Sequence, residues 1–373
     1  MKINKSEAIE AINKICLVIS DNNLEDQLLH IQAHRDNEYI YIGVEKTFIV
    51  LAFKIKIRVE NSDRINLNLK VNFLTFAAIV QHCSEIIKIS KHGKNILKIN
   101  DCLINFLPPQ KAPQKGGTFI PYSPSYNSFS ISAPELIEGI KRTKYATSGD
   151  PDRHTLMGIA IHRDYISATD GHRLARFKRK MSGNDLNKNI SPIALVYWKQ
   201  VLSIIDDTES EIKVDRNFQT TVLMGDNWIY CEKSMTYPSI DNVIPIEFKE
   251  CFTLSKSSLI SALERCGSTV NHTSDERVTG TIDLELETSN NYFSVSRGEN
   301  TEIIKQKQTT EVIKQKQTTQ KKVKVTLNPC YLWDGLKNLD GDNLTILFNS
   351  EDAPIILKDD NAIALLMPVK RIR

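Results

Sequence analysis

The 373-residue chain has few of the features that mark membrane proteins, disulfide-stabilised proteins or metalloproteins. Its apolar residues never form the run of roughly 18 that spans a bilayer, and its start lacks the apolar segment of a signal peptide. Its seven cysteines are an odd number, are scattered and never occur as C-x-x-C, which argues against a zinc site or a disulfide framework. We therefore expect a cytoplasmic protein with reduced thiols, no metal and no cofactor.

Recognisable catalytic motifs are also missing. The sequence contains no Walker loop, no G-x-S-x-G and no H-E-x-x-H. His162-Arg163-Asp164 and His34-Arg35-Asp36 imitate the kinase catalytic tripeptide, but a kinase also needs a Gly-rich loop and an Asp-Phe-Gly motif. His172 beside Asp170 could serve as a general base, yet no nucleophile or oxyanion device accompanies it. We expect no catalytic residues and no enzymatic activity.

The sequence also lacks a large excess of either positive or negative residues. The formal net charge is +3, and residues 303–324 alone contribute seven Lys and one Glu. The pI of about 8.3 is therefore no sign of the dense basic surface with which many proteins grip nucleic acid. Most of these lysines lie in residues 304–320, a near-perfect tandem duplication. This segment either extends a hairpin or forms a solvated loop insertion, and its polarity favours the insertion.

Three segments of the chain repeat one pattern: a short strand, a helix cap and an apolar-periodic helix. They begin at Lys2, Phe129 and Phe252, and the helix positions Ala8, Leu136 and Leu259 are spaced 128 and 123 residues apart. Helix caps are predicted at Asn4, Ser132 and Ser255. This regular spacing predicts three similar domains.

A second helix, followed by alternating strand-like sequence, is predicted in each repeat, beginning near Val71, Pro192 and Asn328. Two helices backed by antiparallel strands give an α+β unit. Proline-rich joins at 108–124 and 238–245 place the domain boundaries. The predicted domains are 1–124, 125–248 and 249–373, the last containing the 304–320 duplication.

The run Ser167–Ala175, S-A-T-D-G-H-R-L-A, predicts a hairpin with a turn at Asp170-Gly171. Such a polar loop could be a phosphate grip, a catalytic His with its carboxylate or an ordinary hairpin that faces water. From the loop alone, the ordinary hairpin is favoured.

Together with the threefold spacing, this run resembles the signature of the beta sliding clamp family, the processivity rings of bacterial DNA polymerase III. The resemblance implies three DNA-clamp domains that form half of a closed ring, completed by a homodimer, with no membrane association. It implies a non-catalytic protein that encircles double-stranded DNA without sequence preference and tethers the replicative DNA polymerase, the clamp loader and repair proteins. The alternative is a diverged clamp-like scaffold that binds partner peptides without being loaded on DNA.

The resemblance also implies a pocket that captures a short linear motif of glutamine, leucines and phenylalanine. The matching residues are Leu156, Thr169, Gly171, His172, Arg173, Leu174, Pro238, Val243, Leu365, Leu366, Met367, Pro368 and Val369. Their apolar side chains suit Leu and Phe anchors, and the His-Arg loop is expected to add donors at the pocket edge.

Two further sets of residues follow from the resemblance. Cations expected to face DNA are Lys141, Arg142, Lys144, Arg153 and Lys199, although each could equally face water. The dimer interface is expected near Ile104 in the first domain and Val270 in the third. The first domain departs most from the family, and Asn242 stands where many members have Arg.

Overall fold

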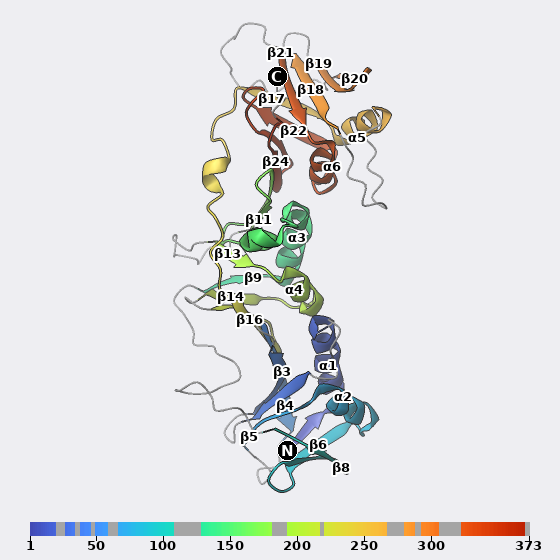
Figure 1. The fold of residues 1–373 in the computed structure, drawn as a ribbon, viewed down its shortest axis with the longest axis vertical. Helices are drawn as coiled ribbons and strands as arrows, with labels where there is room; N and C mark the ends of the chain where they lie inside the picture. The colour runs from blue at the N-terminus through green and yellow to red at the C-terminus, as the bar shows by residue number, and fades with distance from the viewer. Residues whose placement is uncertain are drawn as a thin grey trace. The chain divides into compact units, whose positions relative to one another are not determined.

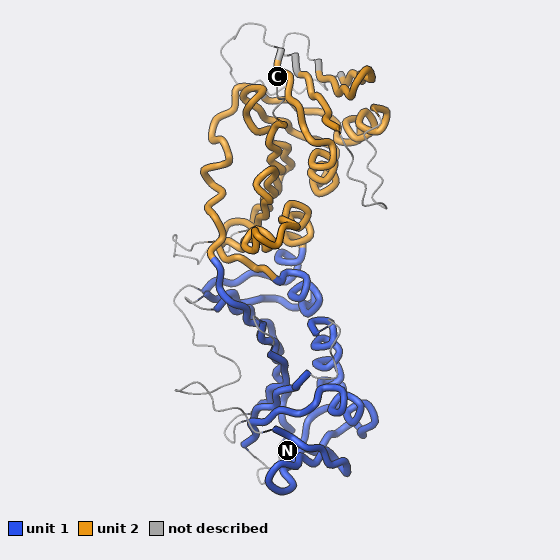
Figure 2. The backbone as a smooth tube through the Cα atoms, viewed as in Figure 1, with its two compact units in different colours: residues 1–137, 185–188, 197–235 blue, residues 138–184, 189–196, 236–373 orange. Residues whose placement is uncertain are grey.

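The structure is a computed structural model that describes residues 1–19, 27–33, 38–45, 49–58, 66–107, 128–180, 192–216, 220–266, 280–287, 292–305 and 322–369. The chain forms two compact units, shown in Figure 2. Unit 1 comprises residues 1–137, 185–188 and 197–235, and unit 2 comprises residues 138–184, 189–196 and 236–373. Within the described ranges, no helix is long and apolar enough to cross a membrane.

Unit 1 is built on a 12-stranded antiparallel sheet. Its main order is β8-β7-β6-β1-β4-β16-β15-β14-β9, and β3, β2 and β5 branch from β4. The strands are β1 (Lys2–Asn4), β2 (Leu28–Ala33), β3 (Tyr39–Glu45), β4 (Ile49–Arg58), β5 (Leu67–Asn72), β6 (Ile86–Lys91), β7 (Ile96–Ile99), β8 (Cys102–Asn105), β9 (Phe129–Ile131), β14 (Ile212–Arg216), β15 (Thr220–Met224) and β16 (Trp228–Lys233).

Helices cover the apolar face of this sheet. They are α1 (Lys5–Ile19), α2 (Phe73–His82) and α4 (Trp198–Ile204), and α3 (Ala133–Thr143) begins in this unit. In Figure 1, α1 and α2 lie together on one side of the unit 1 strands. The predicted cap at Asn4 is present, because its side-chain Oδ1 accepts from the Ser6 N–H at 3.0 Å.

Unit 2 contains two sheets. The eight-stranded one has the order β13 (Ile193–Leu195), β10 (Ile159–Ile161), β11 (Tyr165–Thr169), β12 (Arg173–Lys178), β24 (Ala362–Leu366), β23 (Ile355–Lys358), β22 (Asn343–Phe348) and β17 (Glu250–Ser255). The four-stranded one has the order β20 (Asn300–Lys305), β19 (Tyr292–Arg297), β18 (Ile282–Glu287) and β21 (Lys322–Leu327).

The helices of unit 2 are α5 (Lys256–Arg265), α6 (Pro329–Lys337) and the last part of α3, with 3-10 turns η2 (Lys144–Ala146), η3 (Pro151–Met157) and η4 (Asp241–Val243). Leu259 and Leu263 of α5 and Leu332 and Leu336 of α6 pack into one apolar core with strands of both sheets. This core holds the C-terminal strand in place.

The repeated pattern found in the sequence is present in the structure. Strands β1, β9 and β17 each lead directly into a helix, α1, α3 and α5 respectively. The second helices, α2, α4 and α6, are each followed by antiparallel strands. The α+β class is confirmed, whereas the division at residues 124 and 248 stays a prediction, since each unit combines strands from two predicted domains.

The interpretation of residues 304–320 as a solvated loop insertion was wrong for the first residues of the segment. Ile304 and Lys305 belong to strand β20, where Ile304 pairs with Phe293. The Ile304 side chain is 7% exposed and joins the unit 2 core, so it cannot be part of a solvated loop. The rest of the duplication, 306–320, lies outside the described residues.

Candidate functional site

The signature run forms the turn between β11 and β12. Asp170 Oδ1 accepts hydrogen bonds from the backbone N–H of His172 at 2.9 Å and of Arg173 at 3.0 Å. Thr169 Oγ1 donates to the Arg173 carbonyl at 2.7 Å, and Gly171 has φ of +89°, which favours glycine. The Asp, Gly and Thr of the signature thus build the turn itself.

The C-terminal strand lies beside this turn. Strand β24 pairs antiparallel with β12, with Leu366 opposite Arg173 and Leu365 opposite Leu174. Beyond the strand, the Met367 N–H donates to the His172 carbonyl at 2.9 Å. The prediction that the signature and the C-terminal run come together, although nearly 200 residues separate them in the chain, agrees with this register.

The segment from Tyr237 to Val243 meets the same turn. The buried Tyr237 hydroxyl accepts from the Thr169 N–H at 2.9 Å, and burial raises the pKa of that tyrosine. Arg176 of β12 forms an ion pair with Asp241 of η4 at 3.3 Å. Pro238 and Val243 are exposed on this segment.

Turn η3 supplies the fourth piece. The half-buried Leu156 lies on it, and its carbonyl accepts from the Ser148 N–H at 2.8 Å. Arg153, also on η3, donates from Nη1 to the Asp170 carbonyl at 2.9 Å. All four predicted pieces are therefore tied to one another or to the β11–β12 turn inside unit 2.

The predicted pocket residues divide into two groups by exposure. Leu174, Leu365 and Leu366 are each 1% exposed and form supporting core. Val243, Met367 and Val369 are 47%, 37% and 39% exposed, so their apolar surface faces solvent in this chain. The surface group is the part that can contact a ligand directly.

Arg173 differs from its predicted role as a donor at the pocket edge. Its guanidinium binds Asp170 at 2.9 Å and Asp334 at 2.6 Å, and it lies 4.5 Å from the Tyr331 ring centroid. The side chain is only 13% exposed. Because its Nε and Nη1 already face two carboxylates, Arg173 fastens the turn to helix α6.

Arg142 also departs from its prediction. It is 7% exposed, pairs with Asp340 at 2.8 Å and with Asp359, and donates to the Asn338 carbonyl at 3.1 Å. Burial opposes ionisation of Asp359, but backbone N–H groups and Arg142 together hold the pKa of its carboxyl below the usual value. The prediction of a phosphate contact is wrong for Arg142, because burial and these partners commit its guanidinium to the fold.

The remaining cations expected to face DNA are accessible. Lys141 and Lys144 are exposed at the end of α3 and in η2. Arg153 has 49% of its side chain exposed, and Lys199 is exposed on α4 of unit 1. Accessibility permits phosphate contact for these four side chains but does not test it.

The two residues expected at a dimer interface have different outcomes. Ile104 lies on strand β8, at one end of the unit 1 sheet, but its side chain is 7% exposed. Its neighbour Leu103 is 53% exposed instead. Val270 lies outside the described residues.

Sequence reasoning missed Tyr237 as an anchor of the turn, together with Tyr331 and Asp334 as partners of Arg173. No local pattern could find them, because the Arg173 and Asp334 side chains are 161 residues apart in the chain. An aspartate beside apolar residues, such as Asp334 on α6, is typical of any surface helix.

Comparisons with known proteins identify similar sequences and folds. Residues 241–370 match the family described as DNA polymerase III beta subunit, C-terminal domain. The beta sliding clamp of Synechococcus elongatus is 25% identical over 268 residues, covering 67% of this chain and 68% of its own. The beta sliding clamp of Streptococcus pneumoniae is 27% identical over 278 residues, covering 66% and 67%.

Solved structures extend the likeness to nearly the whole chain. The DNA polymerase sliding clamp from Bacillus subtilis superposes with a TM-score of 0.73 at 17% identity and covers 99% of this chain and 98% of its own. The DNA polymerase III subunit beta from Pseudomonas aeruginosa gives 0.73 at 15% identity and covers 99% of both. At this identity the structures establish the fold. The chain therefore has the sliding clamp fold and is similar in sequence to bacterial beta sliding clamps.

Proposed function

We propose that this chain is a DNA sliding clamp, a non-catalytic processivity subunit. Two copies close into a ring around double-stranded DNA without sequence preference. The ring tethers the replicative DNA polymerase, and its peptide-binding surface also serves the clamp loader and repair proteins. Such a role in chromosome replication would place the protein in the cytoplasm.

The repeat of strand pairing carries this proposal. Within each repeat, we count the strands that follow the first helix and, separately, those that follow the second helix. The third strand counted from the second helix of one repeat pairs antiparallel with the third strand counted from the first helix of the preceding repeat. This holds for β16 on β4 in unit 1 and for β24 on β12 in unit 2. The corresponding strands still lacking such a partner are β8 in the first repeat and β20 in the third, each at the end of its sheet among the described strands.

Pairing β8 of one copy with β20 of another extends the same rule between molecules. The contact is head to tail, and two of them close a dimer by rotation. Leu103 on β8 and Ile303 on β20 are 53% and 57% exposed, whereas Ile104 and Ile304 beside them are each 7% exposed. Exposed apolar side chains on unpaired strand edges favour association. We therefore place the dimer contact at β8 and β20.

The peptide-binding part rests on the exposed apolar side chains of unit 2. Val243, Met367 and Val369 offer adaptable apolar contact for the Leu and Phe of a linear motif. The exposed Pro238 and His172 lie on the same connected segments. The buried Leu174, Leu365 and Leu366 hold these segments in register.

Topological retention on DNA tests the ring directly. The protein is loaded by the clamp loader of its source onto nicked circular DNA and washed at high salt. A closed ring stays on the circle, because salt weakens phosphate contacts but does not open the ring, and it leaves after the circle is cut.

A variant with Leu103→Asp and Ile303→Asp serves as the control and should not be retained. Loss of the unaltered protein from the intact circle, with peptide binding preserved, would favour the scaffold without loading. Retention on linear DNA with free ends would indicate ordinary phosphate binding.

A further inference from the structure

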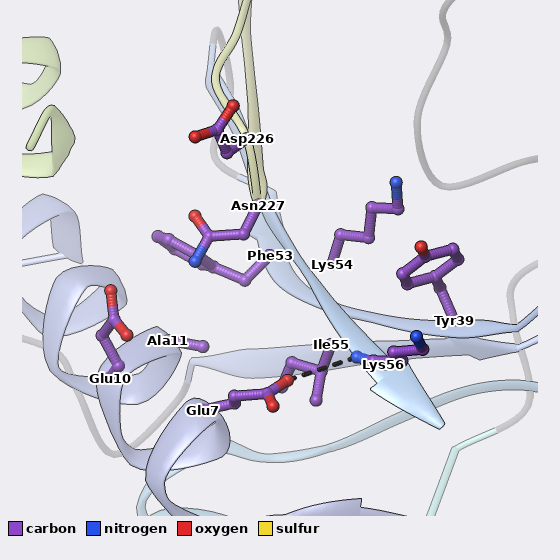
Figure 3. Close-up of a pocket in the computed structure, with 10 residues that line it drawn as sticks. All are labelled: Glu7, Glu10, Ala11, Tyr39, Phe53, Lys54, Ile55, Lys56, Asp226 and Asn227. Atoms are coloured by element: carbon purple, nitrogen blue, oxygen red, sulfur yellow. Dashed lines mark hydrogen bonds between the residues drawn. The ribbon is translucent and has the colours of Figure 1, made fainter. Parts of the chain in front are cut away.

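The unit 1 sheet carries a row of cations on the face opposite its helices. Along β4, Phe53, Ile55 and Ile57 are buried, whereas Lys54, Lys56 and Arg58 occupy the alternate positions. Successive strand residues point to opposite faces, so the three cations share one side. Figure 3 shows Lys54 and Lys56 on the side of β4 away from α1.

Neighbouring strands extend this row. Lys2 of β1 lies opposite Arg58 on β4 and opposite Lys88 on β6, and Lys98 of β7 lies opposite Ser90, two residues beyond Lys88. We call Lys2, Lys54, Lys56, Arg58, Lys88 and Lys98 the basic face. Adjacent strands are about 4.8 Å apart, and like charges directly opposite one another destabilise a sheet. An arrangement that costs stability suggests an anionic ligand.

Carboxylates do not neutralise the exposed cations of this face. Among the described residues, no ion pair involves Lys56, Arg58, Lys88 or Lys98. Two glutamates flank β3: Glu38 precedes the strand and Glu45 is its last residue. The Glu45 carboxylate lies 3.6 Å from the His30 Nε2 atom. The positive charge of the exposed Lys56, Arg58 and Lys88 is therefore available to solvent and to ligands.

Two tyrosines on the neighbouring strand lie opposite cations of the basic face. Tyr39 and Tyr41 on β3 lie opposite Lys56 and Lys54, and the Lys54 Nζ is 4.0 Å from the Tyr39 ring centroid. Figure 3 shows the Tyr39 ring beside the Lys54 and Lys56 side chains, next to a cavity of about 270 Å³. Glu7, Glu10 and Asp226 also line that cavity.

We propose that the basic face of unit 1 binds single-stranded nucleic acid. The cations contact phosphates, and Tyr39 and Tyr41 stack on bases, which is the combination used by sequence-independent single-strand binders. An acidic peptide would match the charge but would leave the tyrosine rings without a role. This site lies on the sheet face away from α1 and α2, and it does not depend on ring closure.

Fluorescence anisotropy with a labelled 20-nucleotide oligothymidylate tests the charges. Binding is measured over a range of salt concentrations for the full chain and for an Arg58→Gln, Lys88→Gln variant. The log–log salt slope should become shallower by about 1.4, because each phosphate contact contributes roughly 0.7 for single strands. The matched control, Lys178→Gln with Lys358→Gln, removes two exposed cations of β12 and β23 in unit 2 and should leave the slope unchanged.

A second variant tests the class of ligand. Tyr39→Leu with Tyr41→Leu should lower oligonucleotide affinity about tenfold or more while the salt slope is retained, since stacking is worth 1–3 kcal/mol per base. An unchanged affinity in this variant, with polyglutamate competing as well as the oligonucleotide, would assign the face to acidic peptides and overturn the proposal. An unchanged slope in the Arg58, Lys88 variant, with its melting temperature preserved, would overturn it as well.

Discussion

At the residue scale, Arg173 shows how a surface motif can serve the fold. Its planar guanidinium holds two carboxylates at once, Asp170 in its own turn and Asp334 on α6, and it stacks near Tyr331. A lysine could not reproduce this planar arrangement of separate donors. Arg173 is therefore a positioning residue for the proposed peptide-binding surface.

A double-mutant cycle between Arg173 and Asp334 measures this connection. Arg173→Met and Asp334→Asn should each destabilise the protein, and the double variant should lose less than the sum of the two. We expect a coupling free energy of about 0.5–3 kcal/mol from urea unfolding, as for contacting groups in one ion-pair network. Strictly additive losses would show that the pair contributes nothing beyond its separate contacts.

His30 carries a pH dependence at the same scale. Burial first, and the charge of Lys70 second, lower its pKa from 6.5 to about 4. Glu45 lies 3.6 Å away but is 54% exposed, so water screens its opposing effect. The folded state thus binds a proton on His30 less readily than the unfolded chain does.

The sign of the effect on stability follows from this lowered pKa. The contribution of His30 is fully present above pH 6.5 and is lost as the pH falls toward 4, because the unfolded chain takes up the proton first. Replacing His30→Gln should flatten the fall of melting temperature between these two pH values. An equally steep fall in the variant would assign that acid sensitivity to other groups.

At the element scale, the end of β24 combines buried and exposed apolar residues. Leu365 and Leu366 are buried, whereas Met367, just after the strand, is 37% exposed. Changes at Met367 and Pro368 should therefore leave the core intact.

The variant Met367→Ala, Pro368→Ala tests the surface contributed by this element. Its affinity for a Gln-Leu-x-Leu-Phe-type peptide should fall by a few kcal/mol in calorimetry, the scale of a central binding residue. Its melting temperature should change little. Leu17→Ala, which alters a 55% exposed leucine of unit 1, is the matched control. Equal peptide affinity in the unaltered protein and the variant would remove this element from the proposed pocket.

At the scale of the whole molecule, the pairing rule predicts the oligomeric state. A charge at Leu103 on β8 or Ile303 on β20 places an ion in the proposed strand contact, where burial without a partner is costly. Leu103→Asp and Ile303→Asp should each convert a dimer to a monomer at micromolar concentration in sedimentation velocity.

The matched control is Leu17→Asp, since Leu17 is similarly exposed but lies on α1 rather than on either edge strand. It should sediment as the unaltered protein does. A monomeric unaltered protein would exclude an autonomous ring, and a dimer in both edge variants would place the contact elsewhere.

The sequence by itself determined the features that depend on short-range physics. Period-two and helical patterns predicted the strands and helices, and the predicted caps at Asn4 and Ser255 begin α1 and α5. The signature Asp170-Gly171 predicted its hairpin, because hydrogen bonds between nearby residues close the turn. Regular spacing further predicted that the elements repeat.

Only the tertiary structure decided what the charged side chains do. Arg142 and Asp359 are 217 residues apart in the chain, so their pairing depends on how the strands of unit 2 assemble. The same holds for the basic face, where register alone places Lys2 between Arg58 and Lys88. The sequence around an arginine or lysine does not reveal whether its side chain faces water or a carboxylate. Long-range packing, rather than the neighbouring residues, determines the partner.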